Sequence, residues 1–354
     1  MTKTNYLSHS KIGLLFRPNS DDFVVSEIPL YEFSGCGEHL MIQVRKKDLT
    51  TWQMLDIVAN HLNIKTKDIG YAGLKDKNAM TIQYISCHKS NENRLSTFKH
   101  DKIKILNTYR HKNKLKIGHL KNNRFFIRLK QVKKSSSTIL NEAIKTIATN
   151  GMANYFGYQR FGIDGDNHKK GEAILKEATK EPNKKLKKFY ISAYQSYNFN
   201  MWLSKRVEVS KLIDEFNINE LKNILNIDTN KLQNIKKQTQ PFKLLLGDVL
   251  SHYPYGRLFL CEDINTESSR FQQKLISPTG ILIGQKTTQA TNEAGVYEKM
   301  FCDFDYKLNG SRRYAWVYPT DITSNYIEDK KHLELEFSLP KGSYATEFVW
   351  HICG

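Results

Sequence analysis

The stretch Gly70-Tyr-Ala-Gly-Leu-Lys-Asp-Lys-Asn-Ala-Met-Thr-Ile-Gln83 decides how the first part of this chain folds. Apolar residues at its two sides predict a strand that enters over residues 69–72 and a strand that leaves over 80–85. The segment 73–78 between them is short and rich in Gly, Asp and Asn, which predicts a tight loop. The sequence therefore predicts a strand–loop–strand unit over this stretch.

Strand and helix patterns surround this unit without a regular β-α-β repeat. Residues 38–47 alternate well enough to predict a strand, and Thr50 or Thr51 can cap a helix that follows it. A second strand–loop–strand unit is expected over residues 115–129, with its turn at 119–123. This mixture predicts an α+β fold built on a mixed, mainly antiparallel sheet with flanking helices.

The middle of the chain has a different pattern. Residues 165–240 are mostly helical in pattern and rich in Lys and Asn, and short strands are expected at 242–246 and 256–261. From Tyr314 onward the pattern is β-like again. We therefore expect one domain to be interrupted by another.

Composition narrows the class of partner. The chain has 354 residues and 54 Lys and Arg against 36 Asp and Glu, a net charge of +18. This excess indicates a polyanionic partner, and the basic residues are spread along the chain, which disfavours a membrane surface. Five scattered cysteines, no signal-peptide pattern and no long apolar run predict a reduced, cytoplasmic protein.

The motifs that would indicate a cofactor are incomplete. Residues 280–287 resemble a phosphate-binding loop, but only three residues separate the two glycines and Gln285 precedes the lysine. None of the 11 histidines forms a pair at metal-ligand spacing with other ligands nearby. We expect neither a nucleotide cofactor nor a bound metal.

Asp76 is the candidate for chemistry in the first loop. It lies between Lys75 and Lys77, and a neighbouring ammonium would hold its carboxylate ionised as nucleophile, base or stabiliser of a cation. The alternative is that Asp76 and Asn78 are turn residues only, as Asp and Asn often are. Composition and spacing leave both interpretations open.

Asn123 is expected at the turn of the second unit, beside Phe125. Alternation places Phe125 on one face of its strand, where it is expected to be buried in the core. Arg124, Phe126 and Arg128 share the other face, which either contacts RNA or is solvated.

Several ordered segments resemble the tRNA pseudouridine synthase D family. Residues 72–83 match the motif A-G-x-K-D-x-x-A-x-T-x-Q, and residues 154–162 match N-Y-F-G-x-Q-R-F-G. Two departures are Asn122, where the family has glycine, and Cys36, which interrupts a G-E-G element. The other matching segments are Pro18 to Glu27, Gly37 to Leu40, Gly118 to Phe125 and Leu339 to Thr346.

The resemblance implies a cofactor-free isomerase that converts uridine to pseudouridine at position 13, in the D-arm of tRNA. It also implies a pseudouridine synthase domain, residues 1–156 with 309–354, interrupted by a family-specific α/β insertion over 157–308. We expect a monomer, because no pattern indicates a coiled coil. A non-catalytic RNA-binding protein, or a synthase acting on another RNA, remains the alternative.

The family's site residues carry over where the motifs match. Asp76 becomes the catalytic carboxylate, and it either stabilises the cationic sugar or abstracts a sugar proton to give a glycal. Phe23, Asn123 and Tyr344 match the pocket that receives the base. The supporting residues are Phe125, Lys75, Gln159 and Arg160.

Overall fold

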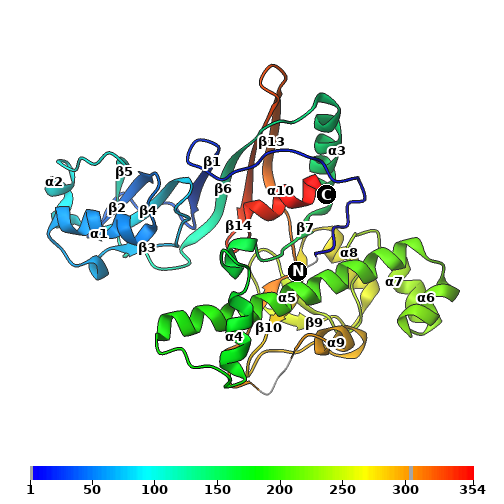
Figure 1. The fold of residues 1–354 in the computed structure, drawn as a ribbon. Helices are drawn as coiled ribbons and strands as arrows, with labels where there is room; N and C mark the ends of the chain where they lie inside the picture. The colour runs from blue at the N-terminus through cyan, green and yellow to red at the C-terminus, as the bar shows by residue number, and fades with distance from the viewer. Residues whose placement is uncertain (1–2, 303–305) are drawn as a thin grey trace. The chain divides into compact units, whose positions relative to one another are not determined.

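The computed structural model describes residues 3–302 and 306–354 and divides into two compact units (Figure 1). The sheet unit comprises Ile12–Asn141 and Pro319–Gly342. The helical unit comprises Glu142–Tyr318, Ser343–Gly354 and the described residues up to Lys11. Among the described residues, no helix is long and apolar enough to cross a membrane.

The sheet unit contains an eight-stranded sheet with the order β13-β14-β6-β1-β4-β2-β5, and β3 pairs with β4 at its side. Only the β1–β4 pair is parallel among these strands, which confirms the mixed, mainly antiparallel sheet. The strands are β1 Phe23–Pro29, β2 His39–Lys46, β3 Gly70–Tyr71, β4 Met80–His88, β5 Ile103–His111, β6 Leu120–Leu129, β13 Thr320–Ile327 and β14 His332–Pro340.

Helix α1, Thr51–Leu62, covers one face of this sheet. Thr50 is its N-cap: the side chain accepts a hydrogen bond from the Gln53 backbone N–H, as the capping pattern predicts. Its buried side chains recur at helical spacing and pack on the alternate residues of β2, each contributing roughly 1.5–3 kcal/mol by burial. The residues in contact include Met54, Leu55, Val58 and Leu62 from α1 with Leu40, Ile42 and Val44 from β2.

The second strand–loop–strand unit differs from the expectation. Strand β6 begins at Leu120, so Asn123 lies inside the strand and not in a turn. The polar run resembles a turn, but Glu27 of β1 and Leu339 of β14 flank Asn123 in the sheet ladder. Neighbours distant in the sequence therefore override the local turn signal.

The helical unit is built around α5, Lys184–Glu215, and an antiparallel sheet with the order β11-β10-β8-β9. The strands of this unit are β7 Met152–Ala153, β8 Val249–His252, β9 Leu258–Leu260, β10 Ile276–Leu282, β11 Ser311–Tyr314 and β12 Trp316–Val317. The remaining α-helices of the chain are α2 Glu92–Leu95, α3 Lys134–Asn150, α4 Asn167–Leu175, α6 Ile218–Leu225, α7 Thr229–Lys236, α8 Ile264–Gln272, α9 Asn292–Lys299 and α10 Ala345–Cys353. Short 3-10 helices lie at Thr66–Asp68, Lys89–Asn91 and Tyr158–Phe161.

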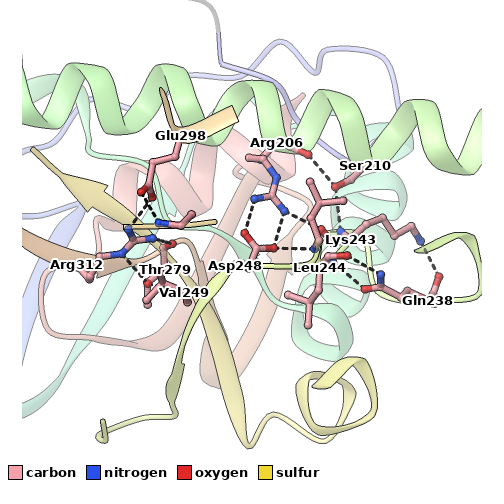
Figure 2. A network of polar contacts seen from close by, with 12 residues as sticks. Arg206, Ser210, Gln238, Lys243, Leu244, Asp248, Val249, Thr279, Glu298 and Arg312 are labelled. Carbon is pink, nitrogen blue, oxygen red and sulfur yellow. Dashed lines mark hydrogen bonds and ion pairs between the residues drawn. The ribbon is translucent and has the colours of Figure 1, made fainter. Parts of the chain in front are cut away.

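The strand expected over residues 242–246 is absent, and side chains replace its ladder (Figure 2). The Leu244 N–H donates to Gln238 Oε1 at 2.8 Å, and the Leu245 N–H donates to Asp248 Oδ2 at 2.8 Å. The Lys243 N–H donates to Ser210 Oγ at 3.0 Å. Because side chains satisfy these buried backbone donors, the apolar segment is buried without a strand partner.

The compact units do not follow the division expected from the sequence. Residues 142–156 and 309–318 pack with the helical unit, although the sequence division places them in the interrupted domain. The two compact units are defined by which residues contact one another. An inserted domain is defined instead by the positions in the sequence at which it interrupts the other domain. The boundaries of the inserted domain, 157–308, therefore stay a prediction.

Candidate active site

The backbone of the loop that carries Asp76 is fixed from both sides. The Lys75 N–H donates to Thr51 Oγ1 at 2.8 Å, at the first turn of α1. The ammonium of Lys46 donates to the Asp76 carbonyl at 3.0 Å and to the Leu49 carbonyl at 2.6 Å. The backbone on both sides of the Asp76 side chain is thereby held by neighbouring elements.

Lys75 extends into the interior of the sheet unit. Its ammonium lies 3.0 Å from Glu27 Oε1 and donates to Asn123 Oδ1 at 2.6 Å. The Glu27 carboxylate also accepts a hydrogen bond from the Tyr84 N–H at 2.9 Å. These contacts join β1, β4, β6 and the Asp76 loop in one buried polar network.

The electrostatics of the loop depend on two lysines. Burial raises the pKa of Asp76 above its ordinary value, and the positive charges of Lys46 and then Lys75 oppose that rise. Burial lowers the pKa of Lys46 to about 8, because desolvation disfavours the charged amine more than Asp76 favours it. Lys46 therefore joins Lys75 as a counter-charge of the carboxylate.

Two aromatic rings that the sequence places in the pocket stack on one another. The ring centroids of Phe23 and Phe125 lie 6.2 Å apart at an interplanar angle of 7°, and Phe337 stacks on Phe125 at 5.5 Å. Phe23 and Phe125 are each 5% exposed. Phe125 is thus buried in the core of the sheet unit, as expected.

The arginines on the opposite face of β6 form ion pairs with carboxylates. Arg124 pairs with Glu336 at 2.5 Å, and Arg128 pairs with Asp22 at 3.1 Å and Glu334 at 3.0 Å. The carboxylates come from β14 and from the segment before β1. This face is therefore locally neutralised, which favours the solvated interpretation over RNA contact.

The remaining site residues form a second group, in the helical unit. Tyr344 precedes α10, and its ring centroid lies 6.1 Å from that of Phe156. A Cβ at Gly157 would lie 2.8 Å from Tyr344 Cδ1, so only glycine permits this approach. Arg160 bonds to two serines of α5, at 3.2 Å to Ser196 Oγ and also to Ser192 Oγ.

The structure brings Lys75 and Asn123 into direct contact beside the Asp76 loop, and Phe23 and Phe125 into one stack. Gln159 is exposed in the helical unit and precedes Arg160 in the chain. Sequence reasoning missed Glu27 and Lys46. Lys46 had a signal, because alternation along β2 places it on the buried apolar face.

Comparisons with known proteins identify the family of the chain. A family model described as tRNA pseudouridine synthase D (TruD) matches residues 2–182. The chain is 50% identical over 348 residues to a tRNA pseudouridine synthase D of Sulfurimonas denitrificans, covering 98% of this chain and 97% of that protein. It is 50% identical over 345 residues to one of Campylobacter jejuni, covering 96% and 92%.

A solved structure shows the same fold. A Methanosarcina mazei protein assigned as a tRNA pseudouridine synthase D superposes with a TM-score of 0.67 at 20% identity, covering 99% of this chain and 95% of that one. The fold agrees along nearly the whole chain, and the family model and the bacterial relatives match it in sequence. The chain belongs to the tRNA pseudouridine synthase D family.

Proposed function

We propose that this protein isomerises uridine to pseudouridine in tRNA, at position 13 of the D-arm, with Asp76 as the catalytic carboxylate. The observation that carries the proposal is the fixed Asp76 loop, with two lysines as its counter-charges, in a chain of this family. We further propose that it acts as a cytoplasmic monomer without a cofactor.

The reaction is an isomerisation, so atoms balance within the substrate. The C1′–N1 bond breaks, the uracil turns, and a C1′–C5 bond forms; C5 loses its proton and N1 gains one. Positive charge develops on the sugar when the first bond breaks, and a carboxylate stabilises such charge in glycosidases. Asp76 has this role, either through its charge or by taking a sugar proton to give a glycal.

The target base must leave its stack before it reacts. Unstacking costs a few kcal/mol, and stacking on an aromatic ring returns roughly 1–3 kcal/mol per base. In our proposal the aromatic residues that contact the substrate are Phe23, Phe125 and Tyr344. Asn123, which is already oriented by Lys75, hydrogen-bonds the substrate. Gln159 and Arg160 support the RNA.

The proposal is tested by incubating the protein with an unmodified tRNA transcript that carries uridine at position 13 and mapping the modified nucleotide. Pseudouridine at that position supports both the reaction and the site. Product at another uridine keeps the reaction and changes the site. If the protein binds a full set of tRNAs but modifies none of them, the result would favour an RNA-binding protein without catalysis.

We expect Lys46→Met to move the acid limb of kcat/KM to higher pH. Asp76 must be ionised to act, so activity is lost as the pH falls through its pKa, and removing a positive charge raises that pKa. In the wild-type protein, the neutral amine that Lys46 forms above about pH 8 still donates to both carbonyls. The wild-type kcat/KM should therefore change little on the alkaline side of the profile.

Lys47→Met is the matched control for this profile. Lys47 neighbours Lys46 in the chain, but its side chain is 43% exposed and its ammonium lies 3.4 Å from Asp21. Its substitution should leave the acid limb in place. An unmoved limb in Lys46→Met would contradict the coupling between Lys46 and Asp76.

A further inference from the structure

A hollow of about 710 Å³ opens in the sheet unit at the ends of β2 and β5. Its lining is rich in groups that donate hydrogen bonds to anions. His39, at this end of β2, is seven residues from Lys46, or about 23 Å along the strand at roughly 3.3 Å per residue. We call this cavity the histidine hollow and define it by Tyr31, His39, His111, Lys114, Lys116 and His119.

Three histidines form a row across adjacent strands beside this hollow. His39 of β2 lies directly opposite His88 of β4 on one side and His111 of β5 on the other. Directly opposite residues share a face of a sheet, with Cβ atoms roughly 5 Å apart. Burial, and then the positive charges of His88 and Lys114, lower the pKa of His39. A negative ligand would relieve this crowding of like charges.

The imidazoles of the hollow are held in defined orientations. The Ser34 N–H donates to His111 Nδ1 at 3.2 Å, so the neutral ring carries its proton on Nε2 and can donate it to a ligand. The ring of Tyr31 stacks on that of His111 at 5.0 Å and 17°, and its hydroxyl bonds to His119 Nδ1 at 2.8 Å. Among the described residues, His39 Nδ1 is buried and has no hydrogen-bond partner.

The rim of the hollow is tied to the sheet. The Leu115 N–H donates to Ser86 Oγ at 2.9 Å, and the Gly118 N–H donates to the Ala72 carbonyl at 2.8 Å. A Cβ at Gly37 would lie 2.4 Å from the His111 carbonyl, so the loop before β2 also packs closely on the end of β5. These contacts fix the backbone on either side of Lys116, and the Lys114 ammonium donates to the Lys67 carbonyl at 2.9 Å.

We propose that the histidine hollow binds a phosphate group of the tRNA backbone, away from the reacting base. Two lysines and three histidines face it against one exposed carboxylate, Glu32. Fixed N–H donors and ammonium groups are the usual ligands of a phosphodiester. The RNA source rests on the proposed function, whereas the affinity for phosphate rests on the hollow alone.

The first test measures binding of a tRNA transcript to Lys114→Gln/Lys116→Gln. We expect about tenfold weaker binding near 100 mM salt, and a slope of log Kd against log salt that falls by roughly one for each phosphate that the variant no longer neutralises. The control, Lys330→Gln/Lys331→Gln, removes the same charge between β13 and β14, at the opposite edge of the sheet. Equal binding by the two variants would overturn the proposal, provided that both unfold at the wild-type temperature.

The second test identifies the source of the phosphate. The histidine resonances of the full chain are followed by NMR during titration with inorganic phosphate and with the tRNA transcript. Shifts of His39, His111 and His119 with both ligands, weakened in the Lys114→Gln/Lys116→Gln variant, support the proposal. Shifts with inorganic phosphate alone would assign the hollow to a free phosphate compound and overturn the RNA assignment, and no shift with either ligand would overturn the site.

These readouts do not depend on turnover. A protein that makes no pseudouridine but shows the shifts and the change in salt slope would lose the proposed function and keep the hollow. A protein that makes pseudouridine without them would keep the function and lose the hollow.

Discussion

We expect Asp76→Asn to abolish pseudouridine formation while tRNA binding stays within about twofold of wild type. The amide keeps the size of the side chain but has no negative charge for the cationic sugar and no basic oxygen for a sugar proton. Removal of a group with such a role typically costs 10²–10⁴-fold, so we expect a loss of roughly 10³-fold or more. The loop should stay folded, because the Asp76 carbonyl and the Lys75 N–H hold it through the backbone.

The measurement is pseudouridine formed in a tRNA transcript under single-turnover conditions, with binding measured separately. Asp68→Asn is the control, since Asp68 is an exposed carboxylate just before β3 in the same unit. Product from Asp76→Asn at the wild-type rate would remove Asp76 from the mechanism. Loss of both binding and product, with a lowered unfolding temperature, would show a structural role for Asp76.

Asp248→Ala should lower the free energy of unfolding by about 3–5 kcal/mol, because it leaves a buried guanidinium without its partner. Arg206 and Asp248 have side chains 1% and 3% exposed, and two hydrogen bonds of 2.6 and 2.8 Å join them (Figure 2). The same carboxylate accepts the Leu245 N–H. The variant therefore loses an ion pair and a backbone anchor together.

Urea unfolding followed by circular dichroism measures this loss. Glu142→Ala is the control: its pair with Lys145 spans one turn of an exposed helix surface, so its removal should cost less than about 1 kcal/mol. A joint Arg206→Met/Asp248→Leu variant should recover part of the stability, because no unpaired charge remains. A cost below about 1 kcal/mol for Asp248→Ala would show that water reaches the pair.

Local periodicity was sufficient where one element supplies its own partners. The alternation of β2 and the 3.6-residue spacing of α1 predict both elements and their contact, and Thr50 caps the helix as expected. Local periodicity did not predict the structure of residues 242–246, where the side chains of Gln238 and Asp248 accept hydrogen bonds from the backbone of a buried apolar run. No local pattern distinguishes that arrangement from a short strand.

The candidate site also has a part that the local sequence predicts and a part that it does not. The Gly, Lys and Asn residues around Asp76 identify a loop with a carboxylate between two cations, and this much follows from adjacent residues. The partner of Lys75 does not, because Glu27 and Asn123 reach it from strands that only the sheet order makes neighbours. The counter-charge from Lys46 arises because β2 ends beside the loop.

The order of the strands also affects how the chain folds as it leaves the ribosome. Strand β14, residues 332–340, pairs along β6 and places Phe337 on Phe125, yet it is synthesised long after β6, residues 120–129. Until it emerges, β6 has an open edge and an uncovered aromatic ring, a condition that favours aggregation or chaperone binding. A ribosome-stalled chain that ends before residue 320 should therefore be digested readily by protease in the sheet unit, and extension past residue 340 should protect it.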